Sequence, residues 1–182
     1  MAQPSTLYRF SLDLSDIERG IYEKFEFRTA LHPSEAPAYL LTRVIAYALN
    51  FQEGLEFSPQ GLGDPDVPAI RQIGQNGNVN LWIEIGNPSP KKLHKATKSA
   101  GAVKVYTYKD PQVLKRDLAA QYVHKLETIA FYSIKAKALE KIEAALERDN
   151  KWGLVYMDGL LTINIENMSE QFEITRHEIS NS

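Results

Sequence analysis

Alternating apolar and polar residues at the start of the chain predict two antiparallel strands, each with one face in water. The first covers residues 6–14 and the second covers residues 22–30, with a break at Arg19–Gly20. The segment His32–Pro33–Ser34–Glu35 ends the strand pattern, and Ser34 is placed to cap a helix. Apolar side chains at helical spacing predict that helix: Leu40, Leu41, Val44, Ile45, Ala48 and Phe51.

A second strand pattern, Val79–Ile85, is apolar enough for the centre of a sheet. It follows a turn-like segment and ends at Gly86–Asn87–Pro88. Alternation places Leu81, Ile83 and Ile85 on one face and Asn80, Trp82 and Glu84 on the other. A carboxylate in such a strand needs a cation, a hydrogen-bond donor or water, so Glu84 is the first candidate for a functional group.

The chain after this strand predicts a helix and then a parallel strand. Ser89 is a suitable N-cap, with proline at the first helical position, and residues 103–108 alternate as a strand. Strand, helix and strand in this order are typical of a parallel crossover. Within the helix, Lys91, Lys95 and Lys98 recur at i, i+4 and i+7, which is either a solvated surface or a place for an anionic ligand.

The remaining pattern predicts further helices and a terminal group of strands. Residues 110–122 and 135–148 are expected as helices, and residues 67–70, 128–132, 154–157, 160–165 and 172–175 as strands. Asp158–Gly159 is a strong hairpin signal. We expect the terminal strands to pair with the opening strands, either extending a mixed sheet or forming a second one.

Composition limits the class of protein. The 182 residues fit one domain, residues 1–182, and 43% hydrophobic with 24% charged residues is ordinary for a soluble globular protein. No cysteine is present, which excludes disulfides, thiolate zinc sites and cysteine nucleophiles. No apolar run approaches the roughly 18 residues of a membrane span, and the first residues lack a signal-peptide pattern. These features predict a cytoplasmic protein without a membrane partner.

The sequence lacks several well-known chemical motifs. Its four histidines have no spacing typical of metal ligands, and no phosphate-binding glycine loop or serine-nucleophile elbow occurs. The net charge of −2 favours no partner, but residues 90–116 hold eight lysine or arginine residues against Asp110 alone, a local charge of +7. This segment is either a footprint for phosphates or a solvated surface that balances acids elsewhere.

The chain as a whole resembles the YaeQ family of small bacterial proteins. The matching segments are His32–Glu35, Gly61–Leu62, Asp66 with Pro68, Leu81–Glu84 with Gly86 and Pro88, Lys95–Ala96 and Tyr106–Tyr108. That family is similar in fold to the restriction-endonuclease-like nucleases, whose motif is written PD-(D/E)XK. The resemblance implies an α/β (α+β) fold: a mixed sheet with a strand–helix–strand crossover core, extended by N- and C-terminal antiparallel strands.

The same resemblance implies a set of site residues. Pro65–Asp66 supplies the first acid of the motif and Glu84 the second, while Glu35 corresponds to a helical acid that many such nucleases add. Where the motif has lysine, two residues after Glu84, this chain has Gly86. Lys95 is therefore expected to take the place of that lysine. An alternative for Glu35 is a purely structural role in the first turn of its helix, where an acid favours the helix dipole.

Two functions follow as hypotheses. In the first, Asp66, Glu84 and Glu35 bind Mg or Mn through oxygen. Asp66, Glu84 and Lys95 then cleave nucleic-acid phosphodiesters, while Lys91, Lys92 and Lys98 contact the nucleic acid. In the second, the protein is a catalytically inactive module on the same fold that binds nucleic acid or a protein partner in a regulatory role. Asp66 and Glu84 would then be ion-pair partners of Lys95 or Arg71. A third possibility is a protein that binds partners through its terminal strands.

Overall fold

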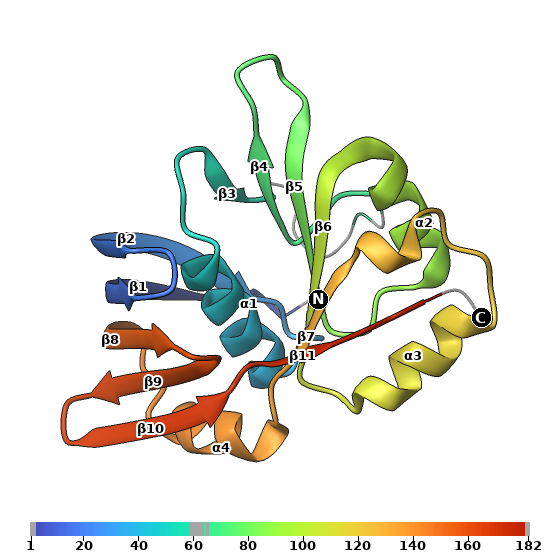
Figure 1. Ribbon diagram of the computed structural model, residues 1–182. Helices are drawn as coiled ribbons and strands as arrows, with labels where there is room; N and C mark the ends of the chain where they lie inside the picture. Colours follow the sequence, from blue (N-terminus) through green and yellow to red (C-terminus); the bar gives the residue numbers. More distant parts are fainter. Residues whose placement is uncertain (1–2, 59–63, 65, 181–182) are drawn as a thin grey trace. The chain divides into compact units, whose positions relative to one another are not determined.

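The computed structural model describes residues 3–58, 64 and 66–180. These residues form four α-helices and eleven strands, and the strands are arranged in two mixed sheets (Figure 1). The chain divides into two compact units. The first consists of Met1–Leu49 with Ile134–Ile174, and the second of Asn50–Ser133 with Thr175–Ser182. Each unit takes its residues from two segments of the chain, and the single domain predicted for residues 1–182 stays a prediction.

The first unit contains a five-stranded sheet in the order β10-β9-β8-β1-β2. Its strands are β1 (Thr6–Asp16), β2 (Ile21–Leu31), β8 (Asp149–Met157), β9 (Leu160–Ile165) and β10 (Met168–Glu173). β1 pairs antiparallel with β2 and parallel with β8, so the terminal strands do pair with the opening strands, as predicted. They form a sheet of their own instead of extending the crossover sheet.

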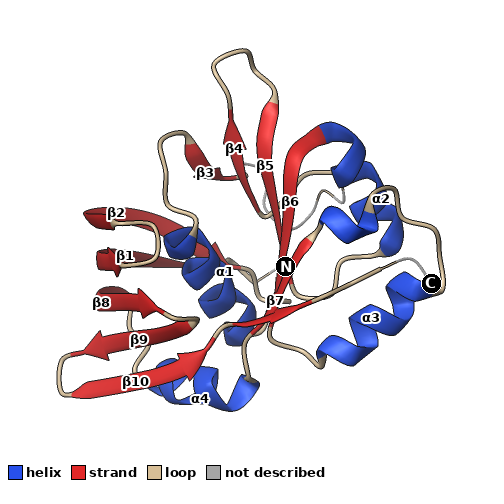
Figure 2. Ribbon diagram, in the orientation of Figure 1, coloured by secondary structure: helices blue, strands red, loops and turns tan. Residues whose placement is uncertain are grey.

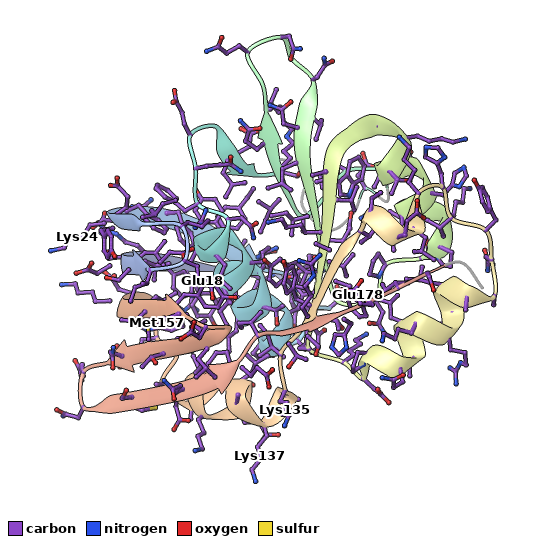
Figure 3. The ribbon with its side chains drawn as sticks, in the orientation of Figure 1. Glu18, Lys24, Lys135, Lys137, Met157 and Glu178 are labelled. Atoms are coloured by element: carbon purple, nitrogen blue, oxygen red, sulfur yellow. The ribbon has the colours of Figure 1, made fainter. Side chains whose placement is uncertain are left out.

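Two helices complete the first unit: α1 (Pro37–Leu49), which contacts β1 and β2, and α4 (Ala136–Ala144), which contacts α1 and β10. The side chains of Phe10, Leu40 and Trp152 are buried in this unit, in accord with the alternation in β1 and the helical spacing in α1. On the polar face of the sheet, Lys24 extends away from β2 (Figure 3). Asp158 and Gly159 both have positive φ, and this confirms the predicted tight hairpin between β8 and β9.

The second unit contains a six-stranded sheet in the order β11-β7-β6-β5-β4-β3. Its strands are β3 (Leu55–Phe57), β4 (Ile70–Ile73), β5 (Val79–Ile85), β6 (Ala100–Thr107), β7 (Ala130–Ser133) and β11 (Thr175–His177). Helix α2 (Pro90–Ser99) connects the parallel strands β5 and β6, which confirms the predicted crossover. The chain segment that connects the neighbouring parallel strands β6 and β7 contains helix α3 (Pro111–Ala119; Figure 2) and a 3-10 helix (Leu126–Thr128).

One face of this second sheet carries the core that positions the site. Side chains from β5, β6 and β7 pack there with side chains from α2, α3 and the segment after α3: Trp82, Leu93, Ala96, Val103, Val105, Leu114, Leu118, Val123, Leu126, Ile129, Phe131 and Ile179. Because Trp82 belongs to this core, the other even-numbered residues of β5 face the same side. Glu84 therefore points toward the side on which α2 packs.

Several predicted boundaries differ from the structure. The helix predicted for residues 135–148 ends at Ala144, and β8 begins at Asp149 instead of residue 154. The buried side chain of Asn150 explains the early start, because its Nδ2 donates to the carbonyl oxygens of Glu147 and Arg9 and so holds this segment beside β1. Such a partner, 141 residues away, overrides the local helical pattern.

Other differences concern shorter elements. The helix predicted for residues 110–122 ends at Ala119, the strand predicted for residues 67–70 begins only at Ile70, and β3 was not predicted. The last predicted strand, residues 172–175, is divided between β10 and β11, which belong to different sheets. In the described part of the chain, no helix is long and apolar enough to cross a membrane.

Candidate functional site

Glu84 is a buried carboxylate near the end of the central strand β5, and only 4% of the residue is exposed. Its Oε1 accepts a hydrogen bond from the Trp82 indole Nε1 at 2.7 Å and lies 3.0 Å from the Lys92 ammonium Nζ. The strand alternation thus places Trp82 and Glu84 on one face, as the sequence predicts. The cation and the donor that a buried carboxylate requires are both present.

The electrostatics of Glu84 are a balance between burial and these two partners. Burial raises the pKa of the Glu84 carboxyl, while the charge of Lys92 and the hydrogen bonds from Trp82 and Lys92 act to lower it. The second oxygen, Oε2, receives no hydrogen bond from any residue that the structure describes. Glu84 can therefore offer one carboxylate oxygen to a ligand while its neighbours hold the other.

Lys92 reaches Glu84 because the start of α2 is fixed. The Ser89 hydroxyl oxygen accepts the backbone N–H of Lys92 at 3.2 Å, and Pro90 occupies the first helical turn, as predicted. Lys92 is thus the third residue after the cap, on the side of the helix that faces β5. The sequence predicts that Lys95 takes the place of the motif lysine beside Glu84 and that Lys92 contacts nucleic acid. In the structure it is Lys92 that lies beside the Glu84 carboxylate.

Lys95 pairs instead with Asp66, the other acid predicted for the site. Its ammonium Nζ lies 2.8 Å from Asp66 Oδ1, and both side chains are largely exposed. The hydrogen bond and the charge of Lys95 lower the pKa of the Asp66 carboxyl, with smaller contributions from Lys91 and Lys92. Helix α2 therefore carries a cation for each of the two acids. The other cation considered from the sequence, Arg71, pairs with Glu56 at 2.7 Å.

The segment before Asp66 is described only in part. Asp64 Oδ1 accepts the backbone N–H of Asp66 at 2.8 Å, which orders the approach to this residue. Pro65, which completes the predicted Pro–Asp pair, lies outside the described residues, as do Gly61 and Leu62.

The position of the missing motif lysine has a special backbone conformation. Gly86, two residues after Glu84, has φ +81°, and its backbone N–H donates to the carbonyl oxygen of Tyr106 at 2.8 Å. A residue with a side chain loses about 1–2 kcal/mol in this left-handed region. The bend at the end of β5 therefore favours glycine over lysine, and a lysine for Glu84 has to come from α2.

Glu35 lies in the first unit and has partners that suit a structural role. Its Oε2 accepts the backbone N–H of His32 at 2.8 Å, and its Oε1 lies 3.6 Å from Arg43 Nη1. Burial raises the pKa of the Glu35 carboxyl, against the effects of the His32 N–H and the Arg43 charge. Glu35 also precedes α1, which begins at Pro37, so the predicted position of Glu35 in the first helical turn is wrong.

Among the residues that the structure describes, no group of three or more histidine, aspartate or glutamate side chains is arranged to hold a metal ion. The two acids of the second unit, Asp66 and Glu84, are linked instead through lysines of one helix. The sequence pattern predicts both acids and the helix, but not the pairing of Lys92 with Glu84. The signal for this pairing was the position of the Ser89 cap, which makes Lys92 the third residue of the helix.

Comparison with known proteins places the chain in a family. The family model described as "YaeQ protein" matches residues 1–175. The uncharacterised protein YaeQ of Escherichia coli K12 is 23% identical over 177 residues, covering 96% of this chain and 97% of that protein. The uncharacterised protein YaeQ of Salmonella typhi is 29% identical over 108 residues, covering 59% of each chain.

Two solved structures are similar over nearly the whole chain. The crystal structure of the YaeQ protein from Pseudomonas syringae has a TM-score of 0.86 and 28% identity, and the match covers 100% of this chain and 99% of that one. The YaeQ protein from Xanthomonas axonopodis pv. citri also gives a TM-score of 0.86, with 24% identity and coverage of 97% and 100%. With the family model matched over residues 1–175, these similarities show that the chain belongs to the YaeQ family.

Proposed function

We propose that Asp66, Glu84 and Lys92 form a metal-dependent site that cleaves phosphodiesters of nucleic acid, on a fold similar to that of the PD-(D/E)XK nucleases. The observation that carries this proposal is the Glu84 carboxylate, buried at the end of a central strand and 3.0 Å from a lysine of the following helix. A buried ionisable group with a shifted pKa and a defined charge partner is typical of functional sites.

The carboxylate oxygens of Glu84 and Asp66 are suitable ligand atoms for Mg or Mn. Glu84 has a carboxylate oxygen without a donor from the described residues, and the Asp66 carboxylate is exposed on the same side of α2 as Lys92 and Lys95. Mg and Mn prefer such oxygen ligands. When bound, the metal would supply a Lewis acid for the phosphodiester.

The protein residues then have distinct roles. Glu84 and Asp66 would hold the cation, and Trp82 fixes the Glu84 carboxylate in one orientation through its indole N–H. Lys92, freed from part of its pairing with Glu84, would stabilise the negative charge that develops on the phosphate group in the transition state. Lys95 keeps Asp66 ionised and in place. In this proposal Glu35 is not a ligand.

A second candidate function is favoured by the ion pairs themselves. Both acids are already neutralised by lysines, and glycine occupies the position of the motif lysine. An inactive module of this kind would bind nucleic acid or a protein partner in a regulatory role. It would show salt-dependent binding without turnover.

Calorimetric titration with MnCl2 separates the two functions. The parent protein is expected to bind Mn saturably, and Glu84→Gln and Asp66→Asn are expected to lose this binding. Glu127→Gln, which changes an exposed acid of the same unit, is the matched control and should bind as the parent does. Parent protein that binds no Mn, with or without an added oligonucleotide, would contradict the metal site.

Cleavage assays with labelled oligonucleotides then test the lysines. We expect Lys92→Met to abolish cleavage while Mn binding remains, because its role is to stabilise charge on the phosphate. Lys95→Met should reduce cleavage less, because it acts only through Asp66. Equal activity in Lys92→Met and in the parent would remove Lys92 from the mechanism.

A further inference from the structure

Tyr122, in the second unit, is the large aromatic side chain with the highest exposed fraction among the described residues, at 72%. It lies in the connection between α3 and the 3-10 helix. Its neighbour Val123 is fully buried in the core, and so is Leu126, four residues after Tyr122. The connection is thus anchored on the core while the Tyr122 ring faces solvent, so this ring is available for a partner.

His94 of α2 links this connection to the helix of the candidate site. Its ring centroid lies 5.9 Å from that of Tyr122 and 6.3 Å from that of His124, both in edge-on geometry. The backbone N–H of His124 donates to His94 Nδ1 at 3.2 Å. A backbone N–H can only donate, so Nδ1 is the acceptor and the imidazole carries its proton on Nε2. His94 therefore has a fixed ring and one remaining donor.

The helix geometry places lysines between His94 and the acids. Lys91 and Lys98 lie three residues before and four residues after His94, so they are its neighbours on the helix surface. Both are exposed, and Lys98 forms no ion pair with any described residue. Lys92 and Lys95 lie on the opposite flank, where they meet Glu84 and Asp66. The exposed surface of α2 thus has the aromatic and imidazole rings on one side, Lys91 and Lys98 along the middle, and Glu84 and Asp66 on the other side.

We infer that this surface binds a single strand of nucleic acid. One base stacks on the Tyr122 ring, His94 Nε2 donates a hydrogen bond to the strand, and Lys91 and Lys98 contact its phosphates. The inference rests on the proposed function, because the strand then leads across α2 to Glu84 and Asp66.

A single strand suits these residues better than a duplex or an acidic protein. An aromatic ring can stack on a base only when the face of that base is free, as it is in a single strand. A duplex already has its bases stacked, and an acidic protein would use the lysines but has no need of the exposed ring. The combination of an exposed aromatic ring with unpaired cations is typical of proteins that bind single strands.

Fluorescence anisotropy on the full chain tests this inference. The probe is a fluorescein-labelled oligothymidine of about 12 nucleotides, a length within the range of known single-strand sites. It is compared with a duplex of the same length, in EDTA and at fixed salt. We expect the single strand to bind more tightly than the duplex.

Substitutions identify the surface. Tyr122→Ala should weaken binding of the single strand by about tenfold, in line with the usual contribution of base stacking, and Tyr122→Phe should restore it. Tyr22→Ala, which removes an exposed tyrosine of the first unit, is the matched control and should bind as the parent does. Lys98→Gln should weaken binding and lower the slope of log affinity against log salt by about 0.7.

Three results would overturn the inference. These are no binding of the single strand, binding of the duplex at least as tight, or unchanged binding in Tyr122→Ala. Because the assay contains EDTA, it does not depend on the metal site. Absence of single-strand binding would not affect the test for Mn binding. Absence of Mn binding would likewise not affect the test for single-strand binding.

Discussion

Each unit of the protein buries one glutamate beside a cation, and the two pairs differ in the surroundings of the cation. In the first unit, Glu35 faces Arg43, and only 7% of the Arg43 surface is exposed. Arg43 also donates through Nη2 to the Thr29 hydroxyl oxygen at 2.8 Å and to the Ala30 carbonyl oxygen at 2.5 Å. This guanidinium connects α1 to the end of β2 and is held on several sides.

In the second unit, Glu84 faces Lys92, whose side chain is 21% exposed. An ammonium on a flexible chain near the surface can leave its partner and remain solvated, whereas a buried guanidinium cannot. Burial raises the pKa of both glutamates. A buried carboxylate with a shifted pKa therefore does not by itself indicate a functional site. The exposure and flexibility of the paired cation distinguish a structural ion pair from an ion pair that can exchange its partner for a ligand.

The largest loss of stability is expected when the buried pair of Glu35 and Arg43 is broken. Glu35→Gln removes the carboxylate beside a buried guanidinium, and we expect a loss of about 3 kcal/mol in the free energy of unfolding, as for other broken buried ion pairs. Urea denaturation measures this loss. Glu26→Gln breaks an exposed pair with Arg9 in the same unit and is the control, with little expected change. A Glu35→Gln protein as stable as the parent would contradict the structural role of this pair.

An intermediate effect is expected at Gly86, where the motif would have lysine. Gly86→Lys should lose about 1–2 kcal/mol of stability because of the positive φ. Gly86→Ala should lose the same amount, since an added Cβ would meet only a Tyr108 ring carbon at 3.9 Å. Urea denaturation of both variants tests this. If Gly86→Lys unfolded at the same denaturant concentration as the parent, the backbone would not explain the missing lysine.

The smallest change in stability is expected for substitution of Glu84, and this change depends on pH. The native state binds the Glu84 proton more tightly than the unfolded state, because burial raises the pKa above the ordinary 4.5. The parent protein therefore loses stability from this group as pH rises from the ordinary pKa through the raised one. Glu84→Gln lacks this loss, so its stability should increase relative to the parent as the pH rises above the ordinary carboxyl pKa of 4.5.

The control for this pH dependence is Asp66→Asn, for which the sign is opposite. Lys95 lowers the pKa of Asp66, so the parent gains stability from this group as pH rises to its ordinary value of 3.8. Thermal denaturation of both variants and the parent over the same pH series measures the difference. A Glu84→Gln curve parallel to that of the parent would show that Glu84 has no raised pKa in the native protein.

Patterns along the chain were enough to predict the local elements and the direction of their side chains. The two opening strands, the crossover through α2, the Ser89 cap and the turn at Asp158–Gly159 follow from patterns within a few residues. The same alternation placed Glu84 beside Trp82 on one face of β5. These features are local, because backbone geometry fixes the side-chain period within each strand or helix.

Contacts between side chains that are distant along the chain depend on how the elements pack in three dimensions. The parallel pairing of β1 with β8, the early start of β8 at Asp149 and the contact of Glu35 with Arg43 depend on where whole elements pack. The same is true of Lys92, which faces Glu84, and of Lys95, which faces Asp66. Lys92 and Lys95 are three residues apart and differ by about 60° in direction around the helix axis, so a rotation of α2 by about that angle would exchange them. That choice is made by packing of the core and cannot be deduced from spacing along the chain.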